Sequence, residues 1–415
     1  MNTDTRTILQ TPLYFNLFVL LYIECPDLRD EMSTRTSVYL QLKRHKIKRI
    51  SDKTGISEEL LEKFDVLYRK WSLKHYTEDK YEFSEADVRS FEEEIKQALP
   101  EKVFQNFDPI MSSYFSIKKT KKHLDIVRVY CHRHRSEQEF AAAGSICDDI
   151  VASSGRTQGE NIVLDIITSS GRTQGGGSDP RQLFMRFRGV ISFIPGILCG
   201  TERDVLHDTI EEIHELYVSD SLSFGIHDGL LDPCIETRLD DKVLESLVSQ
   251  MRKTLLKDRV RFEEPKSLYV LPSLLPKLRP KEIILKFVIS NVTIHVSQLS
   301  ETLKSAIHNS IYTEVQLSMR LSVCAQLPGQ EEVLNPVDYL KMDIWDDGYE
   351  DLERLRRPFS LTTPPKELKL KYFMFYAPEN RSHVSQVINR TFPTIREEGG
   401  RGSTTDLVIH LYKED

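Results

Sequence analysis

The chain has 415 residues, of which 40% are hydrophobic and 29% are charged, and its formal net charge at pH 7 is −7. This length exceeds one ordinary domain core, so we expect a globular protein of two or three domains. The acidic balance argues against a surface that coats nucleic acid over its whole extent, so basic patches are judged region by region.

The longest apolar run, residues 13–25, lies near the N-terminus. Asn16 and Glu24 interrupt it, and it is shorter than the roughly 20 residues of a membrane-spanning helix. Asp4 beside the single Arg6, with no small-residue cleavage site afterwards, also differs from a signal peptide. We therefore expect a buried element at this position and no membrane partner.

Residues 1–145 read as a helix-rich region. Apolar residues at helical spacing between Leu60 and Trp71 predict an amphipathic helix with its charged side chains in water. A second helix is predicted from Ser84, which forms a capping-box pattern with Asp87, to Pro100, which prevents further propagation.

Positive charge gathers in three separated runs, which are the weak electrostatic footprint of contact with RNA or DNA phosphates. One run is 43–49, the second lies between 118 and 135, and the third is interleaved with apolar residues after 180. A solvated surface is the plainer interpretation of such runs. The candidate nucleic-acid contacts are Lys118, Lys119, Lys121, Lys122, Arg128, Arg133, Arg135, Arg181, Arg186 and Arg188.

Residues 146–180 contain the heptapeptide Ser-Ser-Gly-Arg-Thr-Gln-Gly twice, at 153–159 and 169–175. Such a Gly- and Ser-rich stretch buries little apolar area, so we expect an exposed loop that tolerates changes of length. The β-branched run 161–168 between the copies predicts a short strand. Residues 171–178 have the spacing of a phosphate-binding loop, but Gly177 replaces its lysine, so nucleotide binding there would be weak.

Residues 181–270 form a predicted helical middle region. One predicted helix has the capping-box pair Thr201 and Asp204 at its start and continues to Tyr217. Another covers 243–255. Three prolines within 271–280 then argue against a continuous helix and place a domain boundary there.

The last region, 281–415, changes to a period of two. Alternating apolar and polar residues predict half-buried strands, and a short helix is expected at 300–308. The economical arrangement is an antiparallel sheet with short helices, so the fold class is α+β. The predicted strands are 292–296, 315–323, 368–376 and 407–412.

The cysteines and their neighbouring histidines bear on both compartment and metal binding. The six cysteines contain no CxxC pair, which is typical of reduced, buried thiols in an intracellular compartment. Cys131, His132, His134 and Cys147 have the donor types of a zinc site. Adjacent residues on a strand point to opposite faces, so a basic surface strand with one buried thiol is the preferred interpretation, and no metal is expected.

Nucleophiles and carboxylates in this sequence lack the spacing of known catalytic motifs. The sequence has no Gly-x-Ser-x-Gly and no His-Glu-x-x-His motif. Gly144-Ser145 with Asp148 and Asp149 is too compressed for two metal ions, Gly402-Ser403 with Asp406 supplies one carboxylate, and His227-Asp228-Gly229 is typical of a turn. The sequence therefore predicts neither an enzyme nor a cofactor.

Negative charge concentrates between 331 and 353, with two aromatic residues inside its densest part. The spacing differs from that of a calcium loop, and aromatic residues are enriched at interfaces, so a contact surface for a protein partner is predicted. Its candidate residues are Trp345, Asp346, Asp347 and Tyr349.

These features predict a non-enzymatic structural or scaffolding subunit of a large multi-subunit assembly, with a viral capsid or core component as a concrete example. Its expected partners are other protein subunits, and its expected location is the cytoplasm or a virion. The alternative is a nucleic-acid-associated accessory factor that contacts RNA or DNA through its basic residues and binds nucleotide weakly at 171–178.

Overall fold

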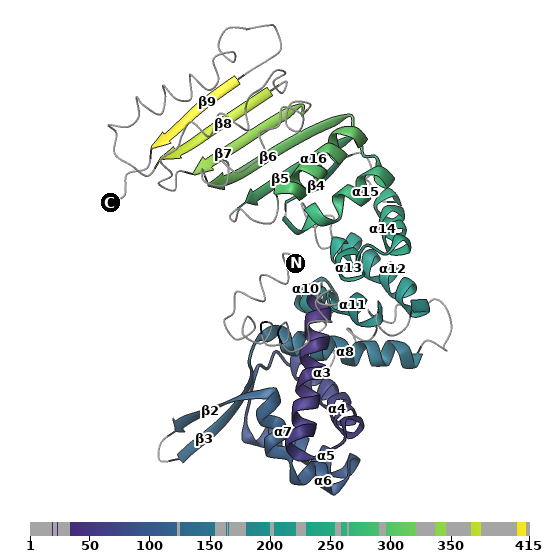
Figure 1. Ribbon diagram of the computed structural model, residues 1–415, viewed down its shortest axis with the longest axis vertical. Coiled ribbons are helices and arrows are strands. Elements are labelled where there is room, and N and C mark those ends of the chain that lie inside the picture. Colours follow the sequence, from purple (N-terminus) through teal and green to yellow (C-terminus); the bar gives the residue numbers. More distant parts are fainter. Residues whose placement is uncertain are drawn as a thin grey trace. The chain divides into compact units, whose positions relative to one another are not determined.

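The computed structural model shows a chain built from both helices and strands (Figure 1). It divides into two compact units, unit 1 with residues 1–216 and 236–243 and unit 2 with residues 217–235 and 244–415. The residues that the structure describes are 19, 23, 34–122, 125–153, 163, 165, 180–199, 203–220, 230–253, 259–263, 265–289, 296–320, 337–345, 367–374 and 405–411.

Unit 1 is mainly helical. Local sequence explains where its helices begin and end: Ser84 Oγ accepts from the N–H of Asp87 at 3.3 Å, and the Asp87 carboxylate accepts from the N–H of Ser84 at 2.7 Å, which confirms the predicted capping box. Its helices are α3 (Arg35–Thr54), α4 (Glu58–Thr77), α5 (Glu85–Ala98), α6 (Glu101–Gln105), α7 (Phe107–Tyr114), α8 (Arg135–Ser153), α10 (Pro180–Ile191) and α11 (Ile194–Cys199).

Three further helices carry the chain across the division between the units. α12 (Arg203–Asp220) begins in unit 1, α13 (Asp232–Glu236) ends there, and α14 (Asp241–Lys253) continues into unit 2. α12 and α14 confirm the two helices predicted in the middle region, although residues 201, 202, 254 and 255 lie outside the described residues.

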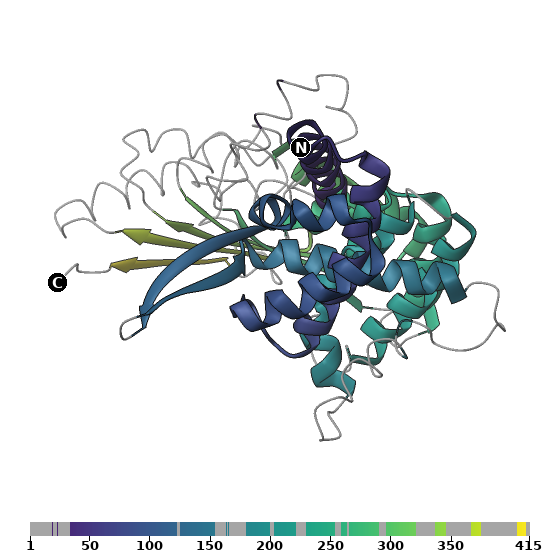
Figure 2. The same ribbon diagram turned by 90° about the horizontal axis from the view of Figure 1, so that it is seen from below.

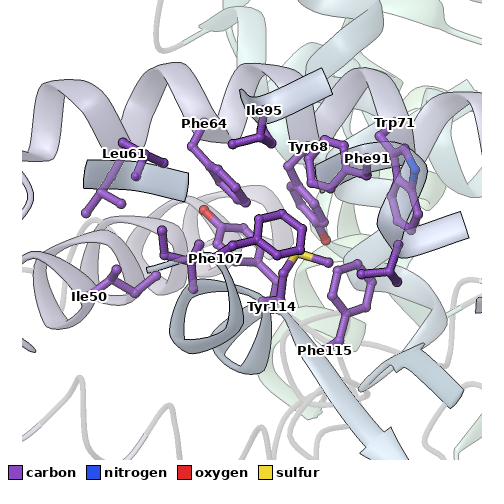
Figure 3. Close-up of a cluster of buried hydrophobic side chains, with 14 of the residues drawn as sticks. Ile50, Leu61, Phe64, Tyr68, Trp71, Phe91, Ile95, Phe107, Tyr114 and Phe115 are labelled. Carbon is purple, nitrogen blue, oxygen red and sulfur yellow. The ribbon is translucent and has the colours of Figure 1, made fainter. Parts of the chain in front are cut away.

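The core of unit 1 is aromatic (Figure 3). The predicted apolar stripes of α4 and α5 bury against each other, and the Trp71 and Phe91 rings lie 5.2 Å apart. From α7, Tyr114 adds a ring 5.6 Å from Phe64. Edge-to-face and tilted pairs at such separations stabilise a core beyond the area they bury.

A three-stranded antiparallel sheet with the order β1-β3-β2 borders this core, formed by β1 (Glu82–Phe83), β2 (Phe115–Lys122) and β3 (Asp125–His132). β1 pairs with β3 only at Cys131 and Tyr130. Beyond those positions β2 and β3 pair with each other alone and form a two-stranded ribbon (Figure 2).

Unit 2 is built on a six-stranded sheet in sequential order, β4-β5-β6-β7-β8-β9, with every neighbouring pair parallel. The predicted antiparallel sheet is therefore wrong. Alternation of apolar and polar residues defines the two faces of a strand but not its direction, and a connection as long as 290–311 returns the chain for a parallel pairing. The strands are β4 (Arg259–Phe262), β5 (Glu282–Ile289), β6 (Tyr312–Arg320), β7 (Tyr339–Trp345), β8 (Glu367–Met374) and β9 (Thr405–Leu411).

The strands β6, β8 and β9 confirm three of the four predicted strands in position, and residues 321–323, 375–376 and 412 lie outside the described residues. The fourth, 292–296, is corrected at its end, because Val296 begins α16 (Val296–Asn309), which contains the predicted helix 300–308. Residues 291–295 lie outside the described residues.

The proline-rich segment 271–280 also differs from expectation, because α15 (Leu271–Leu278) is a helix with Pro276 inside it. Pro272 lies in the first turn, where no helical hydrogen bond needs its missing N–H. Pro276 leaves the Pro272 carbonyl without a helical donor, and the Ser305 hydroxyl of α16 donates to that oxygen at 3.4 Å. This hydrogen bond from α16 thus satisfies the carbonyl that Pro276 leaves without a partner inside α15. The short 3₁₀ helix η5 (Pro265–Tyr269) precedes α15.

The predicted strand 161–168 is wrong at both of its described residues, since Val163 and Asp165 are helical. Val163 is fully buried, and its N–H donates to the Glu212 carboxylate at 3.0 Å. A β-branched run bounded by turn residues does not distinguish a strand from a short buried helix by periodicity alone. Both copies of the heptapeptide from residue 154 onward, and 171–178, lie outside the described residues.

Candidate recognition surface on the parallel sheet

The parallel sheet of unit 2 has two chemically different faces. On one face, side chains of the first four strands are apolar or small and almost completely buried. The helices α15 and α16 follow β4 and β5, and their leucines Leu274, Leu275, Leu299 and Leu303 are buried as well. The buried residues of this face are Val260, Phe262, Ile283, Leu285, Phe287, Thr313, Val315, Leu317 and Leu340.

The other face is mostly polar and accessible. Because side chains alternate along a strand, the residues between the buried positions share this face. The strand register aligns them in rows: Arg259 lies beside Glu282, and Gln316 lies between Lys286 and Lys341. We call this the polar sheet face, and its described residues are Arg259, Arg261, Glu282, Ile284, Lys286, Val288, Tyr312, Glu314, Gln316, Ser318, Tyr339, Lys341 and Asp343.

Ion pairs run across the polar sheet face. Arg259 Nε lies 3.1 Å from Glu282 Oε1, Lys286 Nζ lies 4.0 Å from Glu263 Oε1, and Lys341 Nζ lies 3.4 Å from Asp343 Oδ2. Partly exposed pairs of this kind contribute little to stability. Their effect is to fix a pattern of alternating charge on the surface.

Asp343 has a further property. Its Oδ1 atom is shielded from solvent and receives no hydrogen bond from the described residues. A carboxylate oxygen in that state favours an external donor, because an unsatisfied buried acceptor is costly.

Apolar side chains are mixed into the same surface. Val288 is 62% exposed and Tyr312 37% exposed. An isolated exposed residue needs no explanation, but an aromatic and an aliphatic side chain among paired charges have the composition of an interface.

The predicted nucleic-acid contacts on the ribbon lie in register with one another. Lys119 lies opposite Arg128, and Lys118 lies opposite Val129. All three basic residues are exposed, and Lys118 Nζ lies 3.3 Å from Glu82 Oε1. Lys121 and Lys122 are backbone members of β2 whose side chains lie outside the description.

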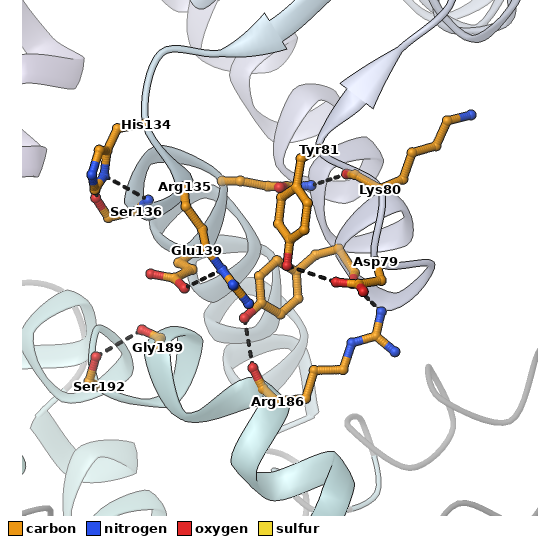
Figure 4. Close-up of polar contacts among 12 residues, drawn as sticks. Asp79, Lys80, Tyr81, His134, Arg135, Ser136, Glu139, Arg186, Gly189 and Ser192 are labelled. Carbon is orange, nitrogen blue, oxygen red and sulfur yellow. Dashed lines mark hydrogen bonds and ion pairs between the residues drawn. The ribbon is translucent and has the colours of Figure 1, made fainter.

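Other predicted basic contacts serve the interior of unit 1 (Figure 4). Arg186 Nη2 donates to the Tyr76 carbonyl at 2.8 Å, and the Tyr76 hydroxyl donates to the Arg186 carbonyl at 2.8 Å. Arg135 Nε lies 3.2 Å from Glu139 Oε1 and its guanidinium covers the Tyr81 ring at 4.9 Å. Arg186 thus joins α4 to α10, whereas Arg135 is exposed and pairs with Glu139 on its own helix, α8.

The remaining predicted residues are scattered. Arg181 and Arg188 lie on α10, and Arg133 follows β3, where its Nη2 donates to the Ser112 carbonyl at 3.4 Å. Trp345 is the last residue of β7, while Asp346, Asp347 and Tyr349 lie outside the described residues.

The cysteine and histidine cluster is divided among separate environments. The Cys131 thiol donates to the Ser116 carbonyl at 3.4 Å, and burial raises the pKa of the Cys147 thiol. His132 packs against Phe115 with ring centroids 4.9 Å apart, while His134 contacts the Ser136 hydroxyl. In the described part of the chain no three His, Cys, Asp or Glu side chains gather in a way that would hold a metal ion.

The Gly144, Ser145 and Asp148 motif is a structural element of α8. Arg69 Nη1 donates to the Gly144 carbonyl at 3.2 Å and to Asp148 Oδ1 at 3.0 Å, and Ser145 is buried. Asp406 lies on β9, and residues 227–229, 402 and 403 are outside the described residues.

Sequence reasoning missed most of the polar sheet face. The one sequence signal for this face was the recurrence of strand patterns at intervals of roughly 25–40 residues, which is the spacing of repeat architectures.

No family model matches this chain, and a comparison with curated proteins also finds no match. None of the described helices is long and apolar enough to cross a bilayer.

Proposed function

We propose that this protein is a non-enzymatic subunit of a protein assembly and that it binds a protein partner through the polar sheet face. The observation that carries the proposal is the sequential order of six parallel strands with a polar face across the first four of them. In such quasi-one-dimensional architectures each strand and its connection contact only their neighbours, which produces an extended surface for a macromolecular partner.

The chemistry of the face favours a partner with basic side chains near its centre. Asp343 Oδ1 would accept from an arginine or lysine, and such a charge-assisted hydrogen bond is stronger than a neutral one. Val288 and Tyr312 would supply the apolar contact area that an interface buries at its core.

The test is the mass and composition of the particle isolated from cells that naturally produce the chain. We expect a native mass above the 48.1 kDa of one copy. Asp343→Lys on the polar sheet face should remove the partner, because it places a cation against the basic side chains of the partner and juxtaposes like charges.

The matched control is Glu301→Lys, the same change of charge on an exposed residue of α16, a helix that accompanies the buried face. This variant should retain the partner. A wild-type mass equal to one copy, or equal loss of the partner from both variants, would contradict the proposal.

A second candidate function, contact with RNA or DNA, is favoured by the β2–β3 ribbon. A two-stranded ribbon fits the major groove of a duplex, and exposed Lys118, Lys119 and Arg128 would neutralise phosphates. Binding of a duplex should weaken steeply with salt and on replacing the four lysines 118, 119, 121 and 122 by alanine. Salt-independent binding, or none, would exclude this function.

A further inference from the structure

Unit 1 contains a cavity of about 310 Å³ between α3, α4, α7 and the start of α8. Six of its lining residues are lysine or arginine, against the two carboxylates of Asp65 and Glu137. The volume lies at the lower end of the range for small-molecule sites. Its basic residues are Lys43, Lys46, Arg49, Lys53, Arg69 and Arg133.

The helix α3 supplies most of this charge from one face. Leu42, Lys46, Arg49 and Lys53 follow one another at spacings of four, three and four residues, and all line the cavity. Residues at these spacings project from the same side of a helix. The stripe therefore aims three cations into one space.

Two of the six cations are neutralised from within the fold. Lys43 Nζ lies 2.7 Å from Glu62 and 3.0 Å from Asp65, and Arg69 bridges Asp65 at 3.1 Å and Asp148 at 3.0 Å. These pairs hold α3, α4 and α8 together, so their charge is not available to a ligand.

The other four cations are not neutralised by ion pairs of this kind within the described part of the chain. The side-chain nitrogens of Lys46, Arg49, Lys53 and Arg133 form no ion pair within 4.0 Å among the residues that the structure describes, although the backbone N–H of Arg133 donates to Glu137 Oε2 at 3.2 Å. Lys46 Nζ lies 4.5 Å from the centre of the Tyr114 ring, and burial lowers the pKa of this lysine. A desolvated ammonium favours an anion, because the anion replaces the hydration that burial removes.

We infer that this cavity binds a small molecule carrying two or more phosphate groups. Two phosphomonoesters have about three to four negative charges at neutral pH, which matches Lys46, Arg49, Lys53 and Arg133. Tyr39 and Phe140 form an apolar part of the wall, against which the carbon skeleton of the ligand packs. This site is independent of the proposed function, which lies on unit 2.

The experiment is calorimetric titration of the full chain at 150 mM salt with inorganic phosphate, pyrophosphate and tripolyphosphate as probes. Affinity should rise in that order as more cations are engaged. The double variant Arg49→Gln with Lys53→Gln should lose about tenfold or more in affinity for tripolyphosphate, since each charge-assisted contact is worth roughly a factor of ten.

The control removes the same charge from the same helix. Arg44→Gln with Lys48→Gln alters two exposed α3 residues that do not line the cavity, and should retain affinity within about threefold of wild type if non-specific attraction is weak. Unfolding midpoints of both variants establish that α3 remains folded.

Three results would overturn the inference: equal loss in both double variants, no binding of tripolyphosphate by the wild type, or displacement of tripolyphosphate by a single-stranded oligonucleotide at lower concentration. The last result would assign the cavity to a nucleic acid instead. The same oligonucleotide failing to compete would support the small-molecule site.

Discussion

His132 is a residue whose ionisation is strongly altered by its surroundings. Its ring packs against Phe83 and Phe115, and its Nδ1 atom lies 3.3 Å from the Tyr68 hydroxyl. Burial, with smaller contributions from Lys46 and His75, lowers the pKa of His132 from its ordinary value of 6.5 to about 3. The folded protein therefore holds the imidazole neutral.

This shift predicts a loss of stability in weak acid. Between pH 6.5 and pH 3 the unfolded chain binds a proton at His132 that the folded chain does not, so the free energy of unfolding falls as pH falls. From pH 6.5 to 5 the contribution is about 2 kcal/mol, and denaturant titrations at both values measure it.

The control is His132→Phe, which keeps an aromatic ring in the site and removes the titrating group. Its stability should fall less between pH 6.5 and 5, a range in which ordinary carboxylates stay mostly ionised. An unchanged slope in this variant would contradict the assignment. His75, whose pKa burial also lowers, acts in the same direction and would supply the remaining slope.

Helix packing in unit 1 depends on a close approach between α11 and α3. A Cβ atom at Gly196 would lie 2.5 Å from Thr36 Cβ. Thr36 is buried, and its N–H donates to Glu236 Oε2 at 3.1 Å, so this part of α3 cannot shift without breaking that bond.

We expect Gly196→Ala to lower the free energy of unfolding by about 1–3 kcal/mol through overpacking. The matched substitution is Gly189→Ala, whose Cβ would meet the Glu139 carboxyl at 2.5 Å. That group ends a flexible side chain and would move aside, so the loss should be smaller. Chemical denaturation of the two variants compares them, and equal losses would contradict the argument.

At this scale the sequence predicted helices better than sheets. The Ser84 and Asp87 cap and the stripes that bury Phe64 and Phe91 depend on neighbours within one turn, which a sequence displays directly. The direction of β5 to β9, and the compensation of Pro276 by Ser305, depend on distant segments and could not be predicted from local patterns.

The candidate sites divide in the same way. The sequence offers the basic run 43–49 as a weak footprint of phosphate contact, with a solvated surface as the plainer interpretation, but only the fold reveals that Glu62 and Asp65 neutralise Lys43 while Lys46 and Arg49 line a cavity. Residues of the polar sheet face lie on separate strands, and register alone brings Lys286 and Lys341 to the two sides of Gln316.

On the scale of the whole molecule, each unit has its own core and one tryptophan. Trp71 packs in the aromatic core of unit 1, and Trp345 ends β7 of unit 2. Leu274→Ala should lower the free energy of unfolding of unit 2 by about 2–5 kcal/mol, because Leu274 is fully buried and its truncation opens a cavity.

Fluorescence of single-tryptophan proteins separates the two cores. In a Trp71→Phe background the transition reported by Trp345 should shift with Leu274→Ala, whereas in a Trp345→Phe background Phe64→Ala should shift the transition reported by Trp71. A Leu274→Ala change that moved the Trp71 transition by the same amount would contradict separate cores.

The strand order of unit 2 also bears on how such a chain changes over evolutionary time. Each strand from β5 to β8 pairs only with the strands before and after it in the chain. Duplication or deletion of one strand together with its return segment would therefore lengthen or shorten the array while the other pairings persist. Lineages could alter the reach and binding preference of this half one module at a time.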